Sequence, residues 1–145
     1  MSEPTIVTGG LAFPEGPVAM TDGSVIVGEI KAGKLTRIAA DGAKTTVAEV
    51  GGGPNGLAIG ADGAMYVCNN GGFQWTELGE MNLPVGPGGV SHPADYVPGS
   101  LQRVDLATGA GSPLSTACAG TRLNGRTALL AAQDRGVWFT GSGTT

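Results

Sequence analysis

The chain has 145 residues and a formal net charge of −4, from 8 basic and 12 acidic side chains. No basic cluster is present, which argues against a nucleic-acid partner because binding to phosphates depends on Lys and Arg. No apolar run approaches the roughly 20 residues that span a bilayer, and the first residues lack the basic and apolar regions of a signal peptide. We therefore expect a soluble, cytoplasmic protein with no membrane partner.

One pattern occurs three times along the chain, at residues 16–29, 56–69 and 128–141. Each copy has a short apolar run, a turn centred on Asp22, Asp62 or Asp134, and a β-rich run. The 27 glycines and 9 prolines fall between the β-rich runs, where turns require them. A strand-turn-strand unit repeated in this way predicts an all-β fold built from the radially arranged sheets of a β-propeller. We expect residues 1–145 to form one domain.

In chain order, a leading strand is predicted at about residues 5–9, followed by a first blade at about 11–51. The run Lys34–Ile38 alternates polar and apolar residues, which is typical of a strand with one solvated face. Asp-Gly pairs after the first and third strands predict tight hairpins, since glycine tolerates the positive φ of such turns. The first blade is therefore predicted to be a four-stranded antiparallel meander.

The second blade is predicted at about residues 55–120 and contains a long loop at 71–99 without secondary structure of its own. A loop of that length is usually functional or mobile. It carries several side chains able to contact a ligand, namely Phe73, Trp75, His92, Asp95 and Tyr96. A partial third blade is predicted at about 127–145, with two strands. Its open sheet would expose an edge and a face, so we expect it to associate with another copy.

Equivalent positions before the three innermost strands hold Glu15, Asn55 and Thr127. The inner strands of a propeller line its central channel, so these side chains are predicted to meet at one mouth. A carboxylate and an amide oxygen there suit a hard cation such as Ca²⁺. The alternative interpretation is that Pro-Glu-Gly and Pro-Asn-Gly are only turn sequences.

Several motifs together resemble the gluconolactonase, senescence-marker-protein and luciferin-regenerating-enzyme family. They are Phe13-Pro-Glu-Gly-Pro17, Gly53-Pro-Asn-Gly-Leu57, Met65-Tyr-Val-Cys-Asn-Asn70, His92-Pro-Ala-Asp-Tyr96 and Leu101-Gln-Arg-Val-Asp-Leu-Ala-Thr-Gly109. The resemblance implies a six-bladed β-propeller, of which this chain would be the N-terminal half, about two to three blades. Two such chains would close one ring as a homodimer. In many members a divalent cation at the channel mouth serves lactone hydrolysis.

Carried over by position, the resemblance implies that Glu15 is a metal ligand and that Asn55 is a ligand or a substrate contact. Bacterial members often have Pro-Asn-Asp-Leu where this chain reads Arg126-Thr-Ala-Leu129. An aspartate is likewise expected where Gly141 stands. These departures remove an amide and two carboxylates from the expected site.

We therefore expect a lactonase that uses a divalent cation, Ca²⁺ or alternatively Zn²⁺, Mn²⁺ or Fe²⁺, to polarise a lactone carbonyl for attack by water. The other hypothesis is a truncated propeller that binds or assembles without catalysis, so whether the chain is an enzyme stays open here. His92 would carry a proton, unless it only orders its loop. The predicted site comprises Glu15, Asn55 and His92 as catalytic residues, Glu15 and Asn55 as metal ligands, and Asn55, Trp75, His92, Asp95, Tyr96, Arg126 and Thr127 as contacts to a small lactone.

Overall fold

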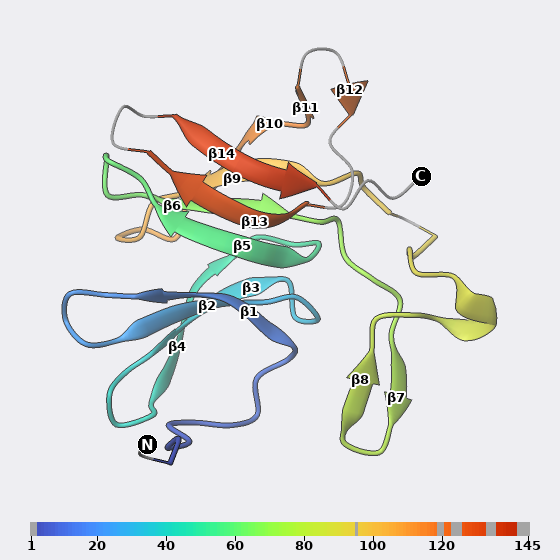
Figure 1. Cartoon of the computed structure of the whole chain (residues 1–145), viewed down its shortest axis with the longest axis horizontal. Helices are drawn as coiled ribbons and strands as arrows, with labels where there is room; N and C mark the ends of the chain where they lie inside the picture. The colour runs from blue at the N-terminus through green and yellow to red at the C-terminus, as the bar shows by residue number, and fades with distance from the viewer. Residues whose placement is uncertain (1–2, 95, 119–120, 123–125, 133–135, 142–145) are drawn as a thin grey trace.

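The structure, a computed structural model, describes residues 3–94, 96–118, 121–122, 126–132 and 136–141. These residues form a nearly all-β fold, in which a short 3-10 helix, η1 (Pro87–Gly89), interrupts the strands. None of the helical structure in these ranges is long and apolar enough to cross a membrane. Figure 1 shows the sheets stacked one above the other, with a hairpin standing beside them.

The first sheet is the predicted four-stranded antiparallel meander (Figure 1). Its strands are paired in chain order and are β1 (Pro14–Ala19), β2 (Val25–Glu29), β3 (Lys34–Ile38) and β4 (Lys44–Glu49). The prediction that β3 has one solvated face is wrong, because Leu35 packs in the core between the sheets, Ile38 lies on the opposite face, and Thr36 is buried as well. The Asp-Gly turns do lie between consecutive strands, as the sequence predicts.

The second sheet has four antiparallel strands, but they are not consecutive in the chain. They are β5 (Pro54–Ile59), β6 (Met65–Asn69), β9 (Ser100–Val104) and β10 (Gly111–Ser115), and the sheet order is β10-β9-β6-β5. A segment of about 30 residues leaves the sheet after β6 and returns at β9. The meander resumes after this segment, as the sequence predicts.

Two predictions about secondary structure are wrong. The long loop has its own structure, a hairpin of β7 (Thr76–Leu78) and β8 (Met81–Leu83) followed by η1. The leading strand predicted at residues 5–9 is also absent, and residues 3–11 form no strand. Gly10 has a positive φ of 67° that breaks the extended run, and the segment is held by hydrogen bonds to the β3–β4 turn region instead.

After the second sheet come two short antiparallel pairs. The first is β11 (Ala117–Cys118) with β12 (Thr121–Arg122), and the second is β13 (Arg126–Ala131) with β14 (Val137–Gly141). The β13–β14 pair lies against the second sheet, where Cys68 Sγ is 3.7 Å from the carbonyl oxygen of Ala128. It is the two-stranded third sheet expected from the repeat.

The three inner strands β1, β5 and β13 pack against one another at glycines. A Cβ placed on Gly16 would lie 2.2 Å from the carbonyl oxygen of Asn55, and a Cβ on Gly56 would lie 2.5 Å from that of Thr127. No other residue type permits backbones to approach so closely. The sheets are therefore successive spokes whose inner strands adjoin, as in a β-propeller.

The core lies between the first and second sheets. The apolar faces of both sheets meet there, and the side chains are almost entirely removed from water. The buried cluster comprises Ile26, Leu35, Ala48, Leu57, Met65, Val67 and Val104. Burial of each large member stabilises the fold by about 1.5–3 kcal/mol, so this interface holds the two blades together.

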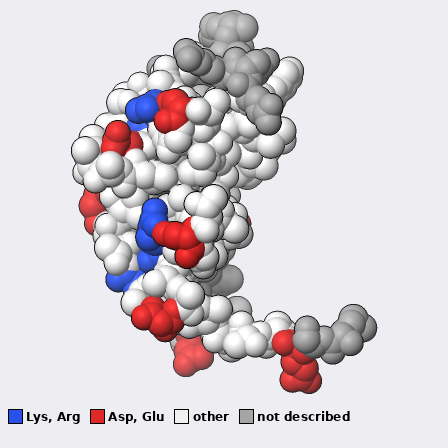
Figure 2. Space-filling view, turned by 90° about the vertical axis from the view of Figure 1, so that its left-hand side faces the viewer, with Lys and Arg blue, Asp and Glu red and all other residues white. Residues whose placement is uncertain are grey.

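An ion pair recurs in the two complete sheets. Asp22, in the β1–β2 turn, accepts a 2.8 Å hydrogen bond from Arg37 on β3, and Asp62, in the β5–β6 turn, accepts a 2.7 Å bond from Arg103 on β9. Each aspartate also caps its own turn by accepting a backbone N–H two residues on. Figure 2 shows the side of the molecule that is on the left in Figure 1, where basic side chains lie beside acidic ones.

Candidate functional site

Glu15, Asn55 and Thr127 occupy matching places at the beginnings of the three inner strands. In each strand the register with its neighbour shifts at this place, between Glu15 and Val18, between Pro54 and Leu57, and between Arg126 and Leu129. Such bulges bend a strand and redirect its side chains, and they are frequent next to active sites. The structure thus gives the three positions one geometry that the sequence could only suggest.

The backbones of Glu15 and Asn55 lie close together, because the residue after Glu15 is the glycine packed on the Asn55 carbonyl. The Glu15 side chain is exposed and borders a cavity of about 600 Å³ on the face of the first sheet that points away from the second. Val25 and Ile38 line this cavity together with Ile6 from the N-terminal segment. The described residues that line it are mainly apolar, and Glu15 is the charged one among them.

A strained residue directly precedes this strand. Phe13 has φ of 59°, and among the described residues it is the one non-glycine with a positive φ. This conformation costs roughly 1–2 kcal/mol for a bulky side chain and is often found where a site must be held in one geometry. The carbonyl groups of residues 12 and 13 accept hydrogen bonds from the N–H groups of Lys31 and Ile30, in the turn after β2.

A buried carboxylate anchors the same segment. Glu29 is 4% exposed; its Oε2 accepts a 2.6 Å hydrogen bond from the N–H of Ala12, and its Oε1 accepts one from Thr36. Burial raises the pKa of Glu29. The hydrogen bonds from Thr36 and Ala12, together with the nearby charge of Lys34, lower it by more, so the pKa lies below its ordinary value. Glu29 is therefore ionised at neutral pH and holds the approach to β1 in place.

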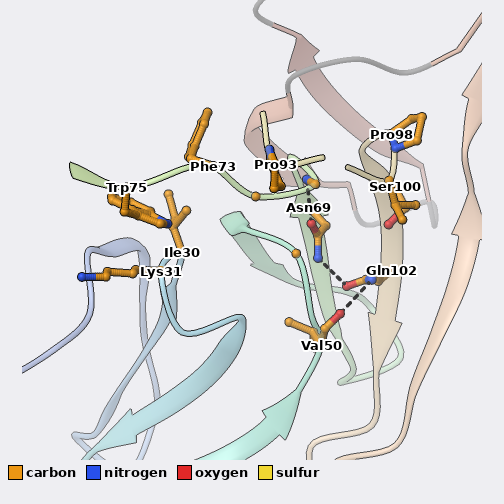
Figure 3. A pocket seen from close by; sticks show the side chains of 14 residues that line it. Ile30, Lys31, Val50, Asn69, Phe73, Trp75, Pro93, Pro98, Ser100 and Gln102 are labelled. Atoms are coloured by element: carbon orange, nitrogen blue, oxygen red, sulfur yellow. Dashed lines mark hydrogen bonds between the residues drawn. The ribbon is translucent and has the colours of Figure 1, made fainter. Parts of the chain in front are cut away.

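A second cavity, of about 510 Å³, lies between the two complete sheets at the same end as the beginnings of β1 and β5 (Figure 3). Figure 3 shows Trp75, Phe73 and Ile30 on one side, and Asn69, Gln102 and Ser100 on the other. Neither Glu15 nor Asn55 lines it. Glu15 borders the first cavity and Trp75 lines the second, while the half-buried Asn55 lines neither of them. These cavities therefore do not bring the predicted site residues together at one mouth.

The apolar side of this second cavity is an aromatic cluster that joins the insertion to the first sheet. The ring of Trp75 lies 5.0 Å from that of Phe13 and 6.0 Å from that of Phe73, with Phe73 edge-on at 88°. Lys31 lies 5.9 Å from the Trp75 ring centroid and forms an ion pair with Glu77 of β7. The insertion from the second blade is therefore held against the first blade.

The polar side is a network of amides. Asn69 Oδ1 accepts hydrogen bonds of 2.9 Å from the N–H groups of Gly53 and Gly71, and its Nδ2 donates to Gly51 and, at 3.4 Å, to Gln102. Gln102 in turn donates to the carbonyl of Val50 at 3.3 Å. Asn69 is buried and fully engaged, and it fixes both the β4–β5 connection and the Gln102 side chain.

His92 and Tyr96 lie in the insertion beside this cavity. Their rings stack with centroids 4.0 Å apart, and the Tyr96 hydroxyl donates a 3.3 Å hydrogen bond to the carbonyl of Asn70. The Tyr96 ring packs on Gly71, which has no room for a Cβ. Among the described residues, His92 Nδ1 and Asn70 Nδ2 are buried without a hydrogen-bond partner. Neither His92 nor Tyr96 borders the Glu15 cavity.

The remaining predicted site residues are Thr127, Arg126 and Asp95, and Thr127 lines neither cavity. Thr127 is exposed, and its hydroxyl lies 3.0 Å from that of Thr140. Arg126 begins β13, but its side chain lies outside the described part of the structure, and Asp95 lies outside the described residues altogether. In the described ranges, no three His, Cys, Asp or Glu side chains cluster closely enough to hold a metal ion.

Sequence reasoning did not identify Ile30, Lys31, Asn69 and Gln102 as cavity residues. Asn69 lies opposite Ser100 and Gln102 lies opposite Val67, so the two amides are diagonal neighbours only because β6 pairs with β9 across the insertion. The one local signal was the pair of asparagines at the end of β6, since two amides at a strand end are unusual in an apolar strand.

Two solved structures share this fold. A gluconolactonase from Xanthomonas campestris is 20% identical with a TM-score of 0.64, and the match covers 90% of this chain and 35% of that one. A candidate gluconolactonase is 17% identical with a TM-score of 0.59, covering 90% of this chain and 36% of that one. The chain thus spans about a third of the length of these structures. A scan of protein-family models and a search of curated proteins gave no match.

At these identities the similarity shows the fold. The expected fold class is confirmed, since the chain consists of antiparallel four-stranded sheets arranged as β-propeller blades. The resemblance to gluconolactonases, which the sequence motifs indicate, is also confirmed at the level of structure.

Proposed function

We propose that this chain contributes to a hydrolase that opens cyclic esters, with Glu15 and Asn55 at its reaction centre. The observation that carries the proposal is the packing of β1 on β5, which brings the backbones of these two residues together at matching bulges. The shared fold with a gluconolactonase supports the same reaction class. Sugar lactones are the substrates this comparison suggests.

We also propose that the reaction depends on a divalent cation. Glu15 and Asn55 supply a carboxylate and an amide oxygen, which are ligands that Ca²⁺ prefers, with Zn²⁺, Mn²⁺ or Fe²⁺ as alternatives. The donors fit a hard cation in kind but not in number, because Ca²⁺ takes six to eight oxygens. A second copy in a homodimer would add a second Glu15 and Asn55, which is one reason to propose that assembly.

The residues of this chain would have distinct roles. A bound cation would polarise the lactone carbonyl. Glu15 would hold its place through the constrained Phe13–Glu15 segment, and the Asn55 amide would orient the substrate through its N–H donors. His92, which the sequence suggested as a proton carrier, does not border the Glu15 cavity, so we assign it no role in this reaction.

A second candidate function is binding without turnover. The observation that favours it is the content of the third inner strand, where Thr127 is engaged with Thr140 and Ala128 has no polar group. A site lacking the polar groups of this strand would retain the scaffold and a ligand cavity but not the reaction. The two functions differ in whether added metal produces hydrolysis.

The test is hydrolysis of glucono-1,5-lactone by the full chain, and the rate is measured from the acid that is released. The rate is compared after removal of metals and after addition of Ca²⁺, Zn²⁺ or Mn²⁺. We expect metal-dependent turnover that the Glu15→Gln substitution lowers by about a hundredfold or more. Glu49→Gln is the matched control, because Glu49 is an exposed carboxylate on the outermost strand β4 of the same sheet. Equal metal-dependent rates for the wild type and Glu15→Gln would reject the role of Glu15, and no hydrolysis by either protein with any of the metals would reject the hydrolase proposal and favour binding alone.

A further inference from the structure

The cavity between the two complete sheets has an apolar wall and a polar wall that face each other (Figure 3). Trp75 and Phe73 form the apolar wall, and their edge-on arrangement at 88° makes a corner rather than a parallel-sided slot. The indole presents an apolar face on which the C–H groups of a sugar ring can lie. The aromatic wall therefore suits a ring that has one apolar face.

The polar wall offers hydrogen bonds of both kinds. The carboxamide of Gln102 makes two long contacts, of 3.3 and 3.4 Å, and has a further N–H and a further lone pair for a ligand. Ser100 adds a hydroxyl, and the bare backbone of Gly71 and Gly72 allows close approach between the walls. A wall that offers both donors and acceptors matches the hydroxyl groups of a sugar, because each hydroxyl can donate and accept a hydrogen bond.

The charge of the cavity points the same way. Lys31 is the one charged side chain among the described lining residues, and its ammonium group is already paired with Glu77 and hydrogen-bonded to Asn82. An anionic ligand would find no available cation there, and burial of its charge would be unfavourable. The cavity thus selects a neutral ligand.

We propose that this cavity is a binding site for a neutral sugar ring, which lies on Trp75 and forms hydrogen bonds with Gln102. The inference goes beyond the proposed hydrolase, because neither Glu15 nor Asn55 lines the cavity. Binding here is expected whether or not the chain turns over a lactone. A volume of about 510 Å³ accommodates one or two sugar units.

The chain has two tryptophans, and this allows an internal control. Trp138 is 71% exposed on β14 and does not line the cavity. In an NMR titration of the full chain, each tryptophan gives one indole N–H signal, and the Trp138→Phe variant assigns them. We expect methyl β-D-glucopyranoside to shift the Trp75 signal at millimolar concentration and to leave the Trp138 signal in place.

Two comparison probes test the ligand class. Gluconate has a similar carbon skeleton with a negative charge, and indole is flat and aromatic; both should leave the Trp75 signal almost unchanged at the same concentration. Tighter binding of gluconate or indole than of the glucoside would overturn the proposal, as would no shift with the glucoside up to roughly 50 mM.

Variants of each wall complete the test. Trp75→Ala should weaken glucoside binding about threefold to tenfold, as expected for loss of an aromatic contact. Since Trp75 also packs on Phe13, folding of this variant is checked by its remaining amide spectrum. Gln102→Leu keeps the aromatic wall and should weaken binding to a similar extent while the Trp75 signal remains as a readout. Unchanged affinity in Gln102→Leu would overturn the assignment of the polar wall.

Discussion

The close packing of inner strands makes a quantitative prediction about Gly16→Ala. Alanine at φ of +58° costs about 1–2 kcal/mol. Its Cβ would also lie 2.2 Å from the carbonyl oxygen of Asn55 and 2.9 Å from the amide nitrogen of Leu57. Both are backbone atoms, so the strands must separate, and overpacking of this kind costs about 1–3 kcal/mol. We expect a total loss of about 2–5 kcal/mol, a large part of the stability of a small domain.

Substitutions at two other glycines separate the cost of the positive φ from the cost of the steric clash. Gly23 has φ of +81° and open space around it, so Gly23→Ala measures the backbone conformation alone. Gly56 has an ordinary φ but would place a Cβ 2.5 Å from the Thr127 carbonyl, so Gly56→Ala measures the clash alone. The assay is urea unfolding followed by circular dichroism, with the free energy obtained by linear extrapolation. If Gly16→Ala destabilises no more than Gly23→Ala, the inner strands are not packed as described.

The Glu29→Gln substitution should destabilise the fold by about 1–3 kcal/mol at pH 7, because it replaces a buried, hydrogen-bonded carboxylate. The pKa of Glu29 is lowered in the folded state, so its stabilising contribution is complete above the unfolded pKa of about 4.3 and is lost as the pH falls through the folded value. The gap between wild type and variant in urea unfolding should therefore narrow below about pH 4, and a gap independent of pH would contradict this role. If uncovered faces of the first and third sheets associate, light scattering should give a mass of about 28.6 kDa, twice the 14.3 kDa of one chain. Trp138→Glu on the third sheet should reduce this mass. A monomeric wild type would reject the homodimer.

The first sheet could be predicted from the sequence because its information is local. Each strand of this sheet is joined to the next by a short turn, so the strands pair in the order in which they follow along the chain. The Asp-Gly turns were recognised, but not the second role of the aspartates. The partner of Asp62, Arg103, is 41 residues away and becomes adjacent only when β9 pairs with β6.

The insertion could not be predicted because its structure depends on distant contacts. The hairpin formed by β7 and β8 is too small to be stable alone, and it is held on the first sheet by Lys31 and by the packing of Trp75 on Phe13. No local pattern relates Lys31 to Glu77, which is 46 positions away, or Phe13 to Trp75, which is 62 positions away. For the same reason Trp75 could be named as a contact residue but not placed in a cavity.

The two proposed sites share one mechanical frame, although they share no lining residue. Phe13, whose strained backbone leads directly into Glu15, also carries the ring that supports Trp75. A shift of this segment would therefore move the carboxylate of one site and the aromatic wall of the other together. Buried Glu29 fixes the segment through the N–H of Ala12, so its loss should disturb sugar binding at Trp75 as well as stability. If Glu29→Gln lowers stability but leaves glucoside affinity unchanged, the two sites are mechanically independent.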